Sequence, residues 1–340
     1  MKFTRLAAAA LAAAACLPVL AQEKVLNLYS ARHYQTDEAL YANFTKATGI
    51  RINRIEAGDE ALLERLANEG ANSPADVVLL VDAARLAKAQ QAGLFQPVQS
   101  PVLNAKIPAQ LRAPDGSWYA FSTRARVVVY NKVAVKPEDV DTYEELADPK
   151  NKGKVCTRSG AHPYQLSLAA SLIEHLGEAR AEEWARGVVA NMARPPRGGD
   201  TDQIMGVASG ECGVALSNSY YVARLMRSAK PEDKEAIAKV GVIFPNQGTR
   251  GTHVNVSGGA VAKSAKNRDN AIRFLEYLAS DEAQVYFANG NNEWPVVKTA
   301  VTKNPALEQL GDFKVDPLPV AALLKNAAAA QKMMDRAGYR

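Results

Sequence analysis

The chain has 340 residues, of which 47% are hydrophobic and 23% are charged, and its formal charge at pH 7 is +5. This length exceeds what one typical hydrophobic core occupies, and it suggests two lobes. The lysines and arginines are scattered along the chain rather than massed on one segment, which argues against a nucleic-acid-binding protein.

The first 21 residues are typical of a secretory signal peptide. Lys2 and Arg5 precede an apolar run, and the residues at 19–21 form a small-residue cleavage site. We therefore expect a periplasmic protein whose mature chain begins at Gln22, and loss of the two leader cations lowers the charge from +5 to +3. No later stretch approaches the roughly 18 consecutive apolar residues of a membrane-spanning helix. Cys16 leaves one alternative, cleavage before a lipidated cysteine, which the alanines in front of it disfavour.

Strands and helices alternate through the first part of the mature chain. Alternating or continuous apolar residues predict strands at 25–30, 50–57 and 75–81. Apolar residues at helical spacing predict helices at 37–49, 61–70 and 84–95. This order is typical of an α/β lobe that binds ligands near the carboxyl ends of its strands.

A long β-rich run at 118–132 has no helical pattern and predicts a passage into a second lobe. In that lobe we expect strands at 153–159 and 211–218 and helices at 165–177 and 181–192. A second extended run at 240–264 predicts the return, and helices are expected at 268–280, 282–290 and 313–339. Two crossings between two α/β lobes describe a hinged clamp with a central cleft.

The crossings set the expected boundaries of the lobes. We expect a discontinuous N-terminal lobe of residues 22–122 plus 250–295. The C-terminal lobe is expected to comprise residues 123–249 plus 296–340. The hinges should lie near 121–126 and 244–251, where extended backbone connects the lobes.

Two cysteines, Cys156 and Cys212, remain after the leader. An even number of cysteines in an exported chain predicts a disulfide between them. Two buried free thiols are the alternative. A zinc site is disfavoured, because no second cysteine or histidine stands at zinc-finger spacing.

Several tyrosines follow apolar runs at the points where polar turns or helices begin. They are Tyr34, which follows His33, then Tyr164, and the adjacent pair Tyr220 and Tyr221. A phenolate is a hard anionic oxygen donor, and several phenolates with an imidazole suit Fe³⁺ better than an organic substrate. A free tyrosine titrates near pH 10, but a strong local cation favours the deprotonated oxygen. This set of side chains therefore predicts a protein that captures a ferric ion.

Most of the 12 tyrosines have an ordinary structural interpretation as core or rim aromatics. Tyr220 and Tyr221 differ, because two adjacent tyrosines at a strand end cannot both point into a core. His33 either donates to the metal directly or orients Tyr34, and His162 is interpreted as a residue that caps its turn. The tyrosines assigned to ordinary packing are Tyr29, Tyr41, Tyr130, Tyr143, Tyr277 and Tyr286.

Taken together, these motifs resemble those of periplasmic ferric-ion-binding proteins. Members of this family have the type II solute-binding fold and are the extracytoplasmic receptors of iron ABC importers. The resemblance covers essentially the whole mature chain, and its most specific motif is the paired tyrosine after a strand, here Asn218-Ser219-Tyr220-Tyr221. The other matching segments are those at 33–34, 48–66, 73–80, 124–131, 159–164 and 257–267.

The resemblance also implies how the iron is held. Some members use a histidine, a glutamate, the tyrosine doublet and a bound anion. His33 matches that histidine and Ser159-Gly160-Ala161 matches the anion-holding turn, but Val81 stands where the glutamate should be. Other members use additional tyrosines, and Tyr34 and Tyr164 match both additions. The chain thus looks like the tyrosine-rich subgroup, in which carbonate or another small anion is optional.

In the resembling subgroup, two arginines hydrogen-bond the phenolates from behind, and Arg124 and Arg224 match them. Two guanidiniums would offset the excess negative charge of four phenolates around Fe³⁺. The resemblance implies a monomer that is not an enzyme and that works with an ABC permease and its ATPase.

Two other functions compete with iron capture. The same fold could hold a polyamine, a thiamine-like cation or an oxyanion, although acidic or aromatic box residues would then replace the phenolates. An exported enzyme is the other alternative. It finds little support, because the chain has neither a Gly-x-Ser-x-Gly nucleophile motif nor a His-Glu-x-x-His metal motif.

Overall fold

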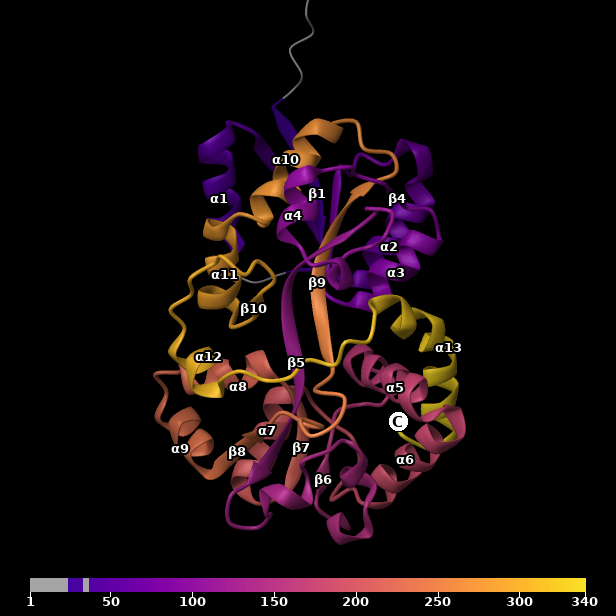
Figure 1. Cartoon of the computed structure of the whole chain (residues 1–340), viewed down its shortest axis with the longest axis vertical. Coiled ribbons are helices and arrows are strands. Elements are labelled where there is room, and N and C mark those ends of the chain that lie inside the picture. The colour runs from indigo at the N-terminus through magenta and orange to yellow at the C-terminus, as the bar shows by residue number, and fades with distance from the viewer. Residues whose placement is uncertain (1–23, 33–36) are drawn as a thin grey trace, which may run out of the picture.

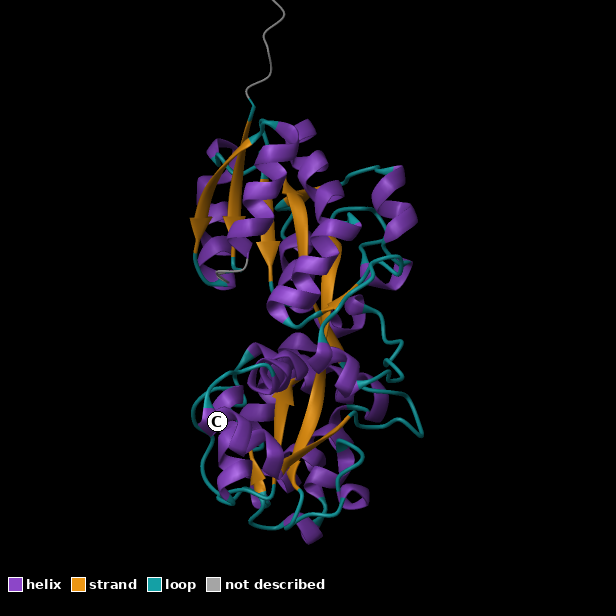
Figure 2. Ribbon diagram, turned by 90° about the vertical axis from the view of Figure 1, so that its left-hand side faces the viewer, coloured by secondary structure: helices purple, strands orange, loops and turns teal. Residues whose placement is uncertain are grey.

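The computed structural model describes residues 24–32 and 37–340. The predicted leader and the predicted ligands His33 and Tyr34 lie outside the described residues. The described chain forms two α/β lobes, one above the other in Figure 1, and the long strand β5 (Tyr119–Asn131) runs through both, paired along its first half with β9 (Val254–Ala262). Figure 2 shows the same two lobes from the side, with the shared strands between them.

The first lobe confirms the predicted alternation of strands and helices. Val77–Leu80 is buried along its whole length, as its unbroken apolar sequence predicts. Helices cover both faces of this sheet in Figure 2. The elements are β1 (Val25–Ser30), α1 (Asp37–Thr48), β2 (Arg51–Glu56), α2 (Asp59–Glu69), β3 (Val77–Leu80), α3 (Ala83–Gln91), β4 (Phe95–Gln96), α4 (Pro101–Lys106), α10 (Arg268–Leu278), α11 (Asp281–Asn291) and β10 (Trp294–Pro295).

The second lobe contains the predicted elements and several that the sequence patterns did not reveal. Helices α7, α8, α9 and α12 were not predicted, and the predicted strand at 153–159 is reduced to two residues. The elements are β6 (Val155–Cys156), α5 (Pro163–Leu176), α6 (Glu178–Ala190), α7 (Asp200–Ser209), β7 (Val214–Asn218), α8 (Ser219–Met226), α9 (Pro231–Lys239), β8 (Val240–Ile243), α12 (Pro305–Leu310) and α13 (Val320–Arg336). Short 3₁₀ turns lie at Gly70–Asn72, Ala109–Leu111, Pro137–Asp139, Glu144–Ala147 and Pro149–Asn151.

One mixed sheet connects the lobes, with strand order β2-β1-β3-β9-β5-β7-β6. β1 pairs in parallel with β2 and β3, whereas β9 is antiparallel to both β3 and β5. The first half of β5 pairs with β9, and its second half pairs with β7 and β8. The ladder between β5 and β9 is therefore the backbone connection on which both lobes are built.

Two details of the chain path differ from the prediction. The second crossing lies within β9 itself, where Val254–Val256 face the crossing part of β5, whereas residues 245–250 form turns before it. The tail is helical only from Val320, because Pro317 and Pro319 lack the backbone N–H that a helix needs and restrict the residues before them. Helix α13 then packs against α5 and α6 of the second lobe and also contacts α3 of the first.

The predicted disulfide between Cys156 and Cys212 is present in the structure. Both cysteines are almost fully buried, and both pack in the same apolar cluster of the second lobe. The bond joins β6 to the segment that enters β7, and the two cysteines are 56 residues apart in sequence. It therefore closes a loop that contains α5, α6 and α7.

We expect this disulfide to stabilise the second lobe. In the chain-entropy model, cross-linking two cysteines 56 residues apart contributes about 4 kcal/mol to the free energy of unfolding. Replacing both cysteines with serine should therefore lower the urea midpoint without changing the fold seen by circular dichroism. Finding two reactive thiols in the unfolded, unreduced wild-type protein would contradict the bond.

His253 lies at the centre of the interlobe region and is 4% exposed. Its Nε2 lies 2.9 Å from the hydroxyl of Ser167, and its backbone carbonyl accepts a hydrogen bond from the N–H of Arg126 at 2.9 Å. Burial, followed by the positive charge of Arg126, lowers the pKa of His253 to about 3. The folded protein therefore holds this imidazole neutral, whereas the unfolded chain protonates it below about pH 6.5.

We expect His253 to make the protein less stable in acid. The folded pKa is depressed, so the contribution to stability is complete above about pH 6.5 and is lost as the pH falls towards 3. Urea unfolding at pH 7 and pH 5 should show a decrease that reaches about 1.4 kcal/mol per pH unit for one such group. The His253→Gln variant should show a shallower decrease, and an unchanged slope would refute the assignment.

Candidate metal centre

Three of the predicted ligands lie at the N-terminal ends of two helices in the second lobe. Tyr164 is the second residue of α5, and Tyr220 and Tyr221 are the second and third residues of α8. The first turn of a helix has unpaired backbone N–H groups and a partial positive charge, which favours anionic groups there. These positions suit tyrosines that must become phenolates.

The structure brings these three side chains together although 56 residues separate Tyr164 from Tyr220. The hydroxyl oxygens of Tyr164 and Tyr220 are 3.0 Å apart, within hydrogen-bond distance. The rings of Tyr220 and Tyr221 lie 4.2 Å apart, centroid to centroid, at an angle of 31°. Tyr220 is 6% exposed, and Tyr164 and Tyr221 are half-buried, so the cluster lies at the edge of the lobe rather than inside its core.

The residues before each tyrosine determine where its helix starts. His162 is the N-cap of α5, and its Nδ1 accepts a hydrogen bond from the N–H of Tyr164 at 3.2 Å, while Pro163 occupies the first helical position. Ser219 opens α8, and its hydroxyl accepts a hydrogen bond from the N–H of Ala125 on β5 at 3.1 Å. The start of α5 is therefore fixed by its own turn, and the start of α8 is fixed against the crossing strand β5.

His162 caps its helix rather than contributing a charge. Burial, followed by the positive charge of Arg158, lowers the pKa of His162 to about 3, so its ring stays neutral and able to accept a hydrogen bond. The ring also packs edge-on against Tyr164, with centroids 4.5 Å apart. The interpretation of His162 as a capping residue is confirmed.

Arg224 lies beside the tyrosine doublet on the same helix. Its guanidinium carbon lies 4.9 Å from the ring centroid of Tyr221. Its Nη2 also donates to the hydroxyl of Thr201 at 2.8 Å, although the side chain is largely exposed. The cation is thus in place next to one predicted phenolate.

Arg124 approaches from the crossing strand β5 and is 2% exposed. Its Nη1 donates to the hydroxyl of Ser257 at 2.8 Å and lies 3.7 Å from a carboxylate oxygen of Glu293. Arg124 and Tyr164 line the same small interlobe space, together with Arg126, Asn218, His253 and Asn255. The second predicted cation therefore faces the tyrosine cluster.

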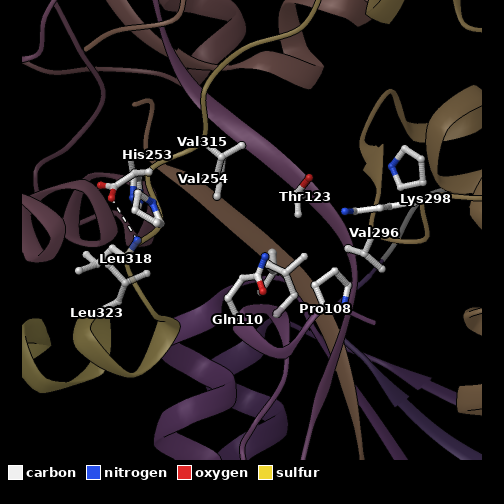
Figure 3. Close-up of a pocket in the computed structure, with 15 residues that line it drawn as sticks. Pro108, Gln110, Thr123, His253, Val254, Val296, Lys298, Val315, Leu318 and Leu323 are labelled. Atoms are coloured by element: carbon white, nitrogen blue, oxygen red, sulfur yellow. Dashed lines mark hydrogen bonds between the residues drawn. The ribbon is translucent and has the colours of Figure 1, made fainter. Parts of the chain in front are cut away.

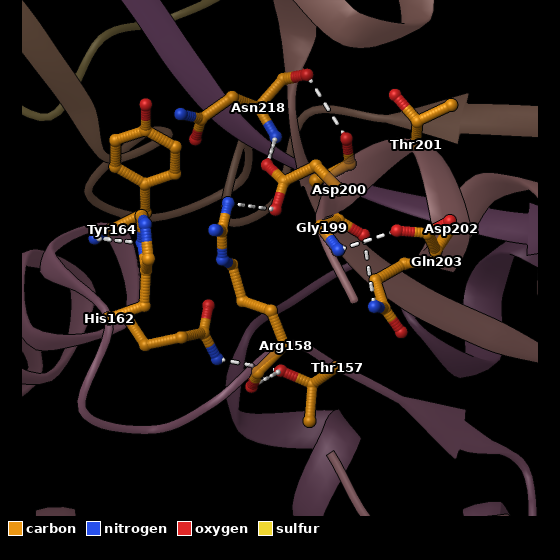
Figure 4. A network of polar contacts seen from close by, with 12 residues as sticks. Thr157, Arg158, His162, Tyr164, Gly199, Asp200, Thr201, Asp202, Gln203 and Asn218 are labelled. Atoms are coloured by element: carbon orange, nitrogen blue, oxygen red, sulfur yellow. Dashed lines mark hydrogen bonds and ion pairs between the residues drawn. The ribbon is translucent and has the colours of Figure 1, made fainter. Parts of the chain in front are cut away.

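Sequence reasoning missed a charge network beside the tyrosines. Asp200, at the start of α7, pairs with Arg126 at 2.6 Å and with Arg158 at 3.1 Å, and Figure 4 shows the contact with Arg158. The guanidinium carbon of Arg158 lies 5.0 Å from the ring centroid of Tyr164. The only sequence signal was an aspartate after two glycines at a helix start, and that signal does not reveal its partners.

The turn Ser159-Gly160-Ala161, which matches the anion-holding turn of the family, is tightly packed. A Cβ atom on Gly160 would lie 2.0 Å from the backbone oxygen of Tyr339, so only glycine fits. The N–H of Ala161 donates to the hydroxyl of Ser159 at 3.3 Å, and the N–H of His162 donates to the carbonyl of Ser159. These donors are already paired within the turn.

The first-lobe residues that flank the predicted ligands His33 and Tyr34 are buried and charged. Arg32 pairs with Asp37 at 2.9 Å and with Glu293 at 3.2 Å. Glu293 in turn faces Arg124, so this first-lobe charge cluster reaches the crossing strand. Arg32 and Asp37 therefore belong to one buried network.

A separate cavity lies beside the crossing strands, shown in Figure 3. Its volume is about 590 Å³, and its walls include Thr123 and Val254 of the crossing strands. Tyr164, Tyr220 and Tyr221 do not line it. Within residues 24–32 and 37–340, no group of three or more histidine, cysteine, aspartate or glutamate side chains could hold a metal ion, and no helix is both long and apolar enough to cross a bilayer.

The profile of the bacterial extracellular solute-binding protein family matches residues 39–315. The chain is 50% identical to Iron uptake protein A1 of Synechocystis over 319 residues, which cover 94% of this chain and 88% of that protein. It is 28% identical to the major ferric iron-binding protein of Neisseria meningitidis over 343 residues, which cover 99% and 98% of the two chains.

Solved structures agree with these sequence matches. The Trichodesmium FutA (IdiA) protein, determined with iron and citrate ligands, is 54% identical and superposes with a TM-score of 0.89 over 93% of this chain and all of that one. The ferric binding protein of Campylobacter jejuni is 40% identical, with a TM-score of 0.88 over 93% of this chain and all of that one. The chain therefore belongs to the bacterial extracellular solute-binding proteins and, within them, to the iron-uptake and ferric-iron-binding proteins.

Proposed function

We propose that this protein captures Fe³⁺ in the periplasm by closing its two lobes around the ion and delivers it to the permease of an ABC importer. The observation that carries this proposal is the meeting of Tyr164 and Tyr220, with hydroxyl oxygens 3.0 Å apart and the ring of Tyr221 tilted against that of Tyr220. Hard oxygen donors at one point suit a small, highly charged cation. Relatives named for iron uptake and ferric iron binding support the same ion.

The proposed ligand set draws on both lobes. Tyr164, Tyr220 and Tyr221 come from the second lobe, and Tyr34 and His33 complete the set from the first. A bound Fe³⁺ stabilises deprotonated phenolate oxygens. Their protonation in acid would release the ion, because binding and proton loss are linked.

The surrounding charges favour this assignment. Four phenolates around Fe³⁺ leave one excess negative charge, and Arg124 and Arg224 lie beside the cluster to offset it. A binding site for an organic cation such as a polyamine would instead be lined by acidic side chains.

A small anion is compatible with the site but is not required by it. The amide nitrogen of Asn218 is buried and has no hydrogen-bond partner among the described residues. Asn218 lines the interlobe space beside Tyr164 and Arg126, which has no room for a water-sized group in this structure, so an anion would bind there only after the space widens. Citrate accompanies iron in the Trichodesmium relative.

The proposed cycle uses the lobes as moving units, with residues 22–122 plus 250–295 in one and 123–249 plus 296–340 in the other. The chain acts as a monomer that binds its cargo between the lobes and then docks on the permease, which an ATPase drives. Its relatives are solute-binding transport proteins, so we assign it binding and delivery rather than catalysis.

The tyrosine doublet provides the test of the ion and its ligands. Iron-loaded wild-type protein should be coloured by charge transfer from phenolate to Fe³⁺. The double variant Tyr220→Phe with Tyr221→Phe should lose this band, because two adjacent anions are deleted. Tyr34→Phe or Tyr164→Phe should weaken binding less, since water can fill one open position, and His33→Ala should have the smallest effect.

Tyr286→Phe is the matched control, because the Tyr286 hydroxyl accepts a hydrogen bond from Asn43 on the outside of the first lobe. This variant should keep the colour and affinity of the wild type. Visible absorbance during titration with a ferric chelate measures both quantities. A doublet variant that keeps the wild-type band would refute the ligand assignment.

Closure provides a second test, because the proposed ligands lie on both lobes. The radius of gyration measured by small-angle scattering should decrease when iron is added to the wild type. It should not decrease in the doublet variant, which has lost two second-lobe ligands. An unchanged radius in loaded wild-type protein would mean that the site is formed without movement of the lobes.

A further inference from the structure

We propose that Asp200 is a positioning residue that holds the second-lobe tyrosines at the spacing a single cation needs. This inference rests on the proposed function and assigns a role to a side chain that does not itself touch the metal. Asp200 is the first residue of α7 and is fully buried. Its two carboxylate oxygens connect the starts of the helices that carry the tyrosines.

The carboxylate receives hydrogen bonds from three donors on three different segments. Oδ2 accepts from Nη1 of Arg126 at 2.6 Å and from the backbone N–H of Asn218 at 2.7 Å. Oδ1 accepts from Nη1 of Arg158 at 3.1 Å. Figure 4 shows Asp200 between Arg158 and Asn218, with Tyr164 on the far side of Arg158.

One branch of the network fixes the start of α8. Asn218 is the N-cap residue of this helix, two positions before Tyr220. Its backbone N–H is held by Asp200, and its side-chain oxygen accepts from Nη1 of Arg126 at 3.1 Å. Asp200 therefore sets where the strand β7 ends and where the doublet begins.

The other branch fixes the start of α5. Arg158, held by Asp200, places its guanidinium against the ring of Tyr164, 5.0 Å from the centroid. Arg126, held by the other oxygen, donates through Nη2 to the side-chain oxygen of Gln165, the residue after Tyr164. The position of Tyr164 thus depends on Asp200 through its own ring and through its neighbour.

The chemistry of the contacts requires a carboxylate. Both oxygens accept hydrogen bonds, so an amide in either orientation would turn an N–H₂ group towards a donor. The negative charge also pairs with the buried Arg126 and the partly buried Arg158, whose charges would otherwise be costly inside the protein. Thr201, the residue after Asp200 in α7, accepts a hydrogen bond from Arg224 of α8. The first two residues of α7 therefore contact β5, the turn before α5, the end of β7 and α8.

The test compares Asp200→Asn with Asp202→Asn in the full-length mature protein. Asp202 lies on the same first turn of α7 and is exposed, and its carboxylate accepts only from the N–H of Gly199 at 2.6 Å among the hydrogen bonds of the described residues. Both variants remove one negative charge from the same helix start. Only Asp200→Asn disturbs the contacts that lead to Tyr164 and Asn218.

For Asp200→Asn we expect a loss of iron affinity of about 10–100-fold, the usual effect of removing a group that orients metal ligands. At iron saturation, the phenolate-to-iron band should also be weaker or shifted, because one tyrosine no longer reaches the ion properly. A residue that only stabilises the fold would lower the melting temperature and leave the spectrum of the loaded protein unchanged. Asp202→Asn should match the wild type in affinity and spectrum.

Wild-type spectrum and affinity in Asp200→Asn would overturn the inference, as would equal losses in both variants. Should Asp200→Asn fail to fold, Arg158→Gln carries the test, since it cuts the branch to Tyr164 and leaves the pair between Asp200 and Arg126. That variant should also change the band at saturation, and an unchanged band would overturn the inference. A wild-type protein that shows neither colour nor binding would instead refute the proposed function.

Discussion

The antiparallel ladder between β5 and β9 is the constraint on which the rest of the structure depends. β9 pairs with β3 of the first lobe and with β5, and β5 continues beyond this ladder to pair with β7 of the second lobe, so the ladder joins the first-lobe sheet to the strand that enters the second lobe. The register shifts between Ala120 and Ser122, as a β-bulge does where a strand bends. Any relative movement of the lobes must therefore twist or bend this ladder. The residues that line its faces would be displaced first.

Charge is handled by paired groups on both sides of this ladder. In the second lobe, Asp200 pairs with both Arg126 and Arg158, which leaves one net positive charge, whereas Arg124 faces Glu293 at the crossing. Unpaired buried cations would be costly. The tyrosines themselves lie outside these pairs, at helix starts that favour anions. The protein thus surrounds the proposed phenolates with cations, of which Arg124, Arg126 and Arg158 contact carboxylates and Arg224 contacts the hydroxyl of Thr201.

The secondary structure was predicted correctly where the apolar pattern of a segment matches the way that segment is buried in the fold. The continuous apolar run of β3 and the long β-rich run of β5 appear as predicted. The short helices α7 and α8, of 10 and 8 residues, did not, because so few helical turns give little periodic signal and helices of this length depend on tertiary contacts for their stability. The tail before Val320 was predicted as helix from its alanine-rich remainder, and two prolines prevent that.

The sequence by itself determined the class of the site: tyrosines at strand ends, an exported chain with two cysteines, and two extended crossings indicate a clamp with phenolate donors. What it could not determine is which side chains meet. Tyr164 and Tyr220 are 56 residues apart, yet their hydroxyls lie 3.0 Å apart, and Asp200 accepts hydrogen bonds from the segments in front of both helices. Local patterns report how one segment buries its own apolar face. Contacts between buried charges of different segments depend on the three-dimensional path of the backbone, and only the tertiary structure decided them.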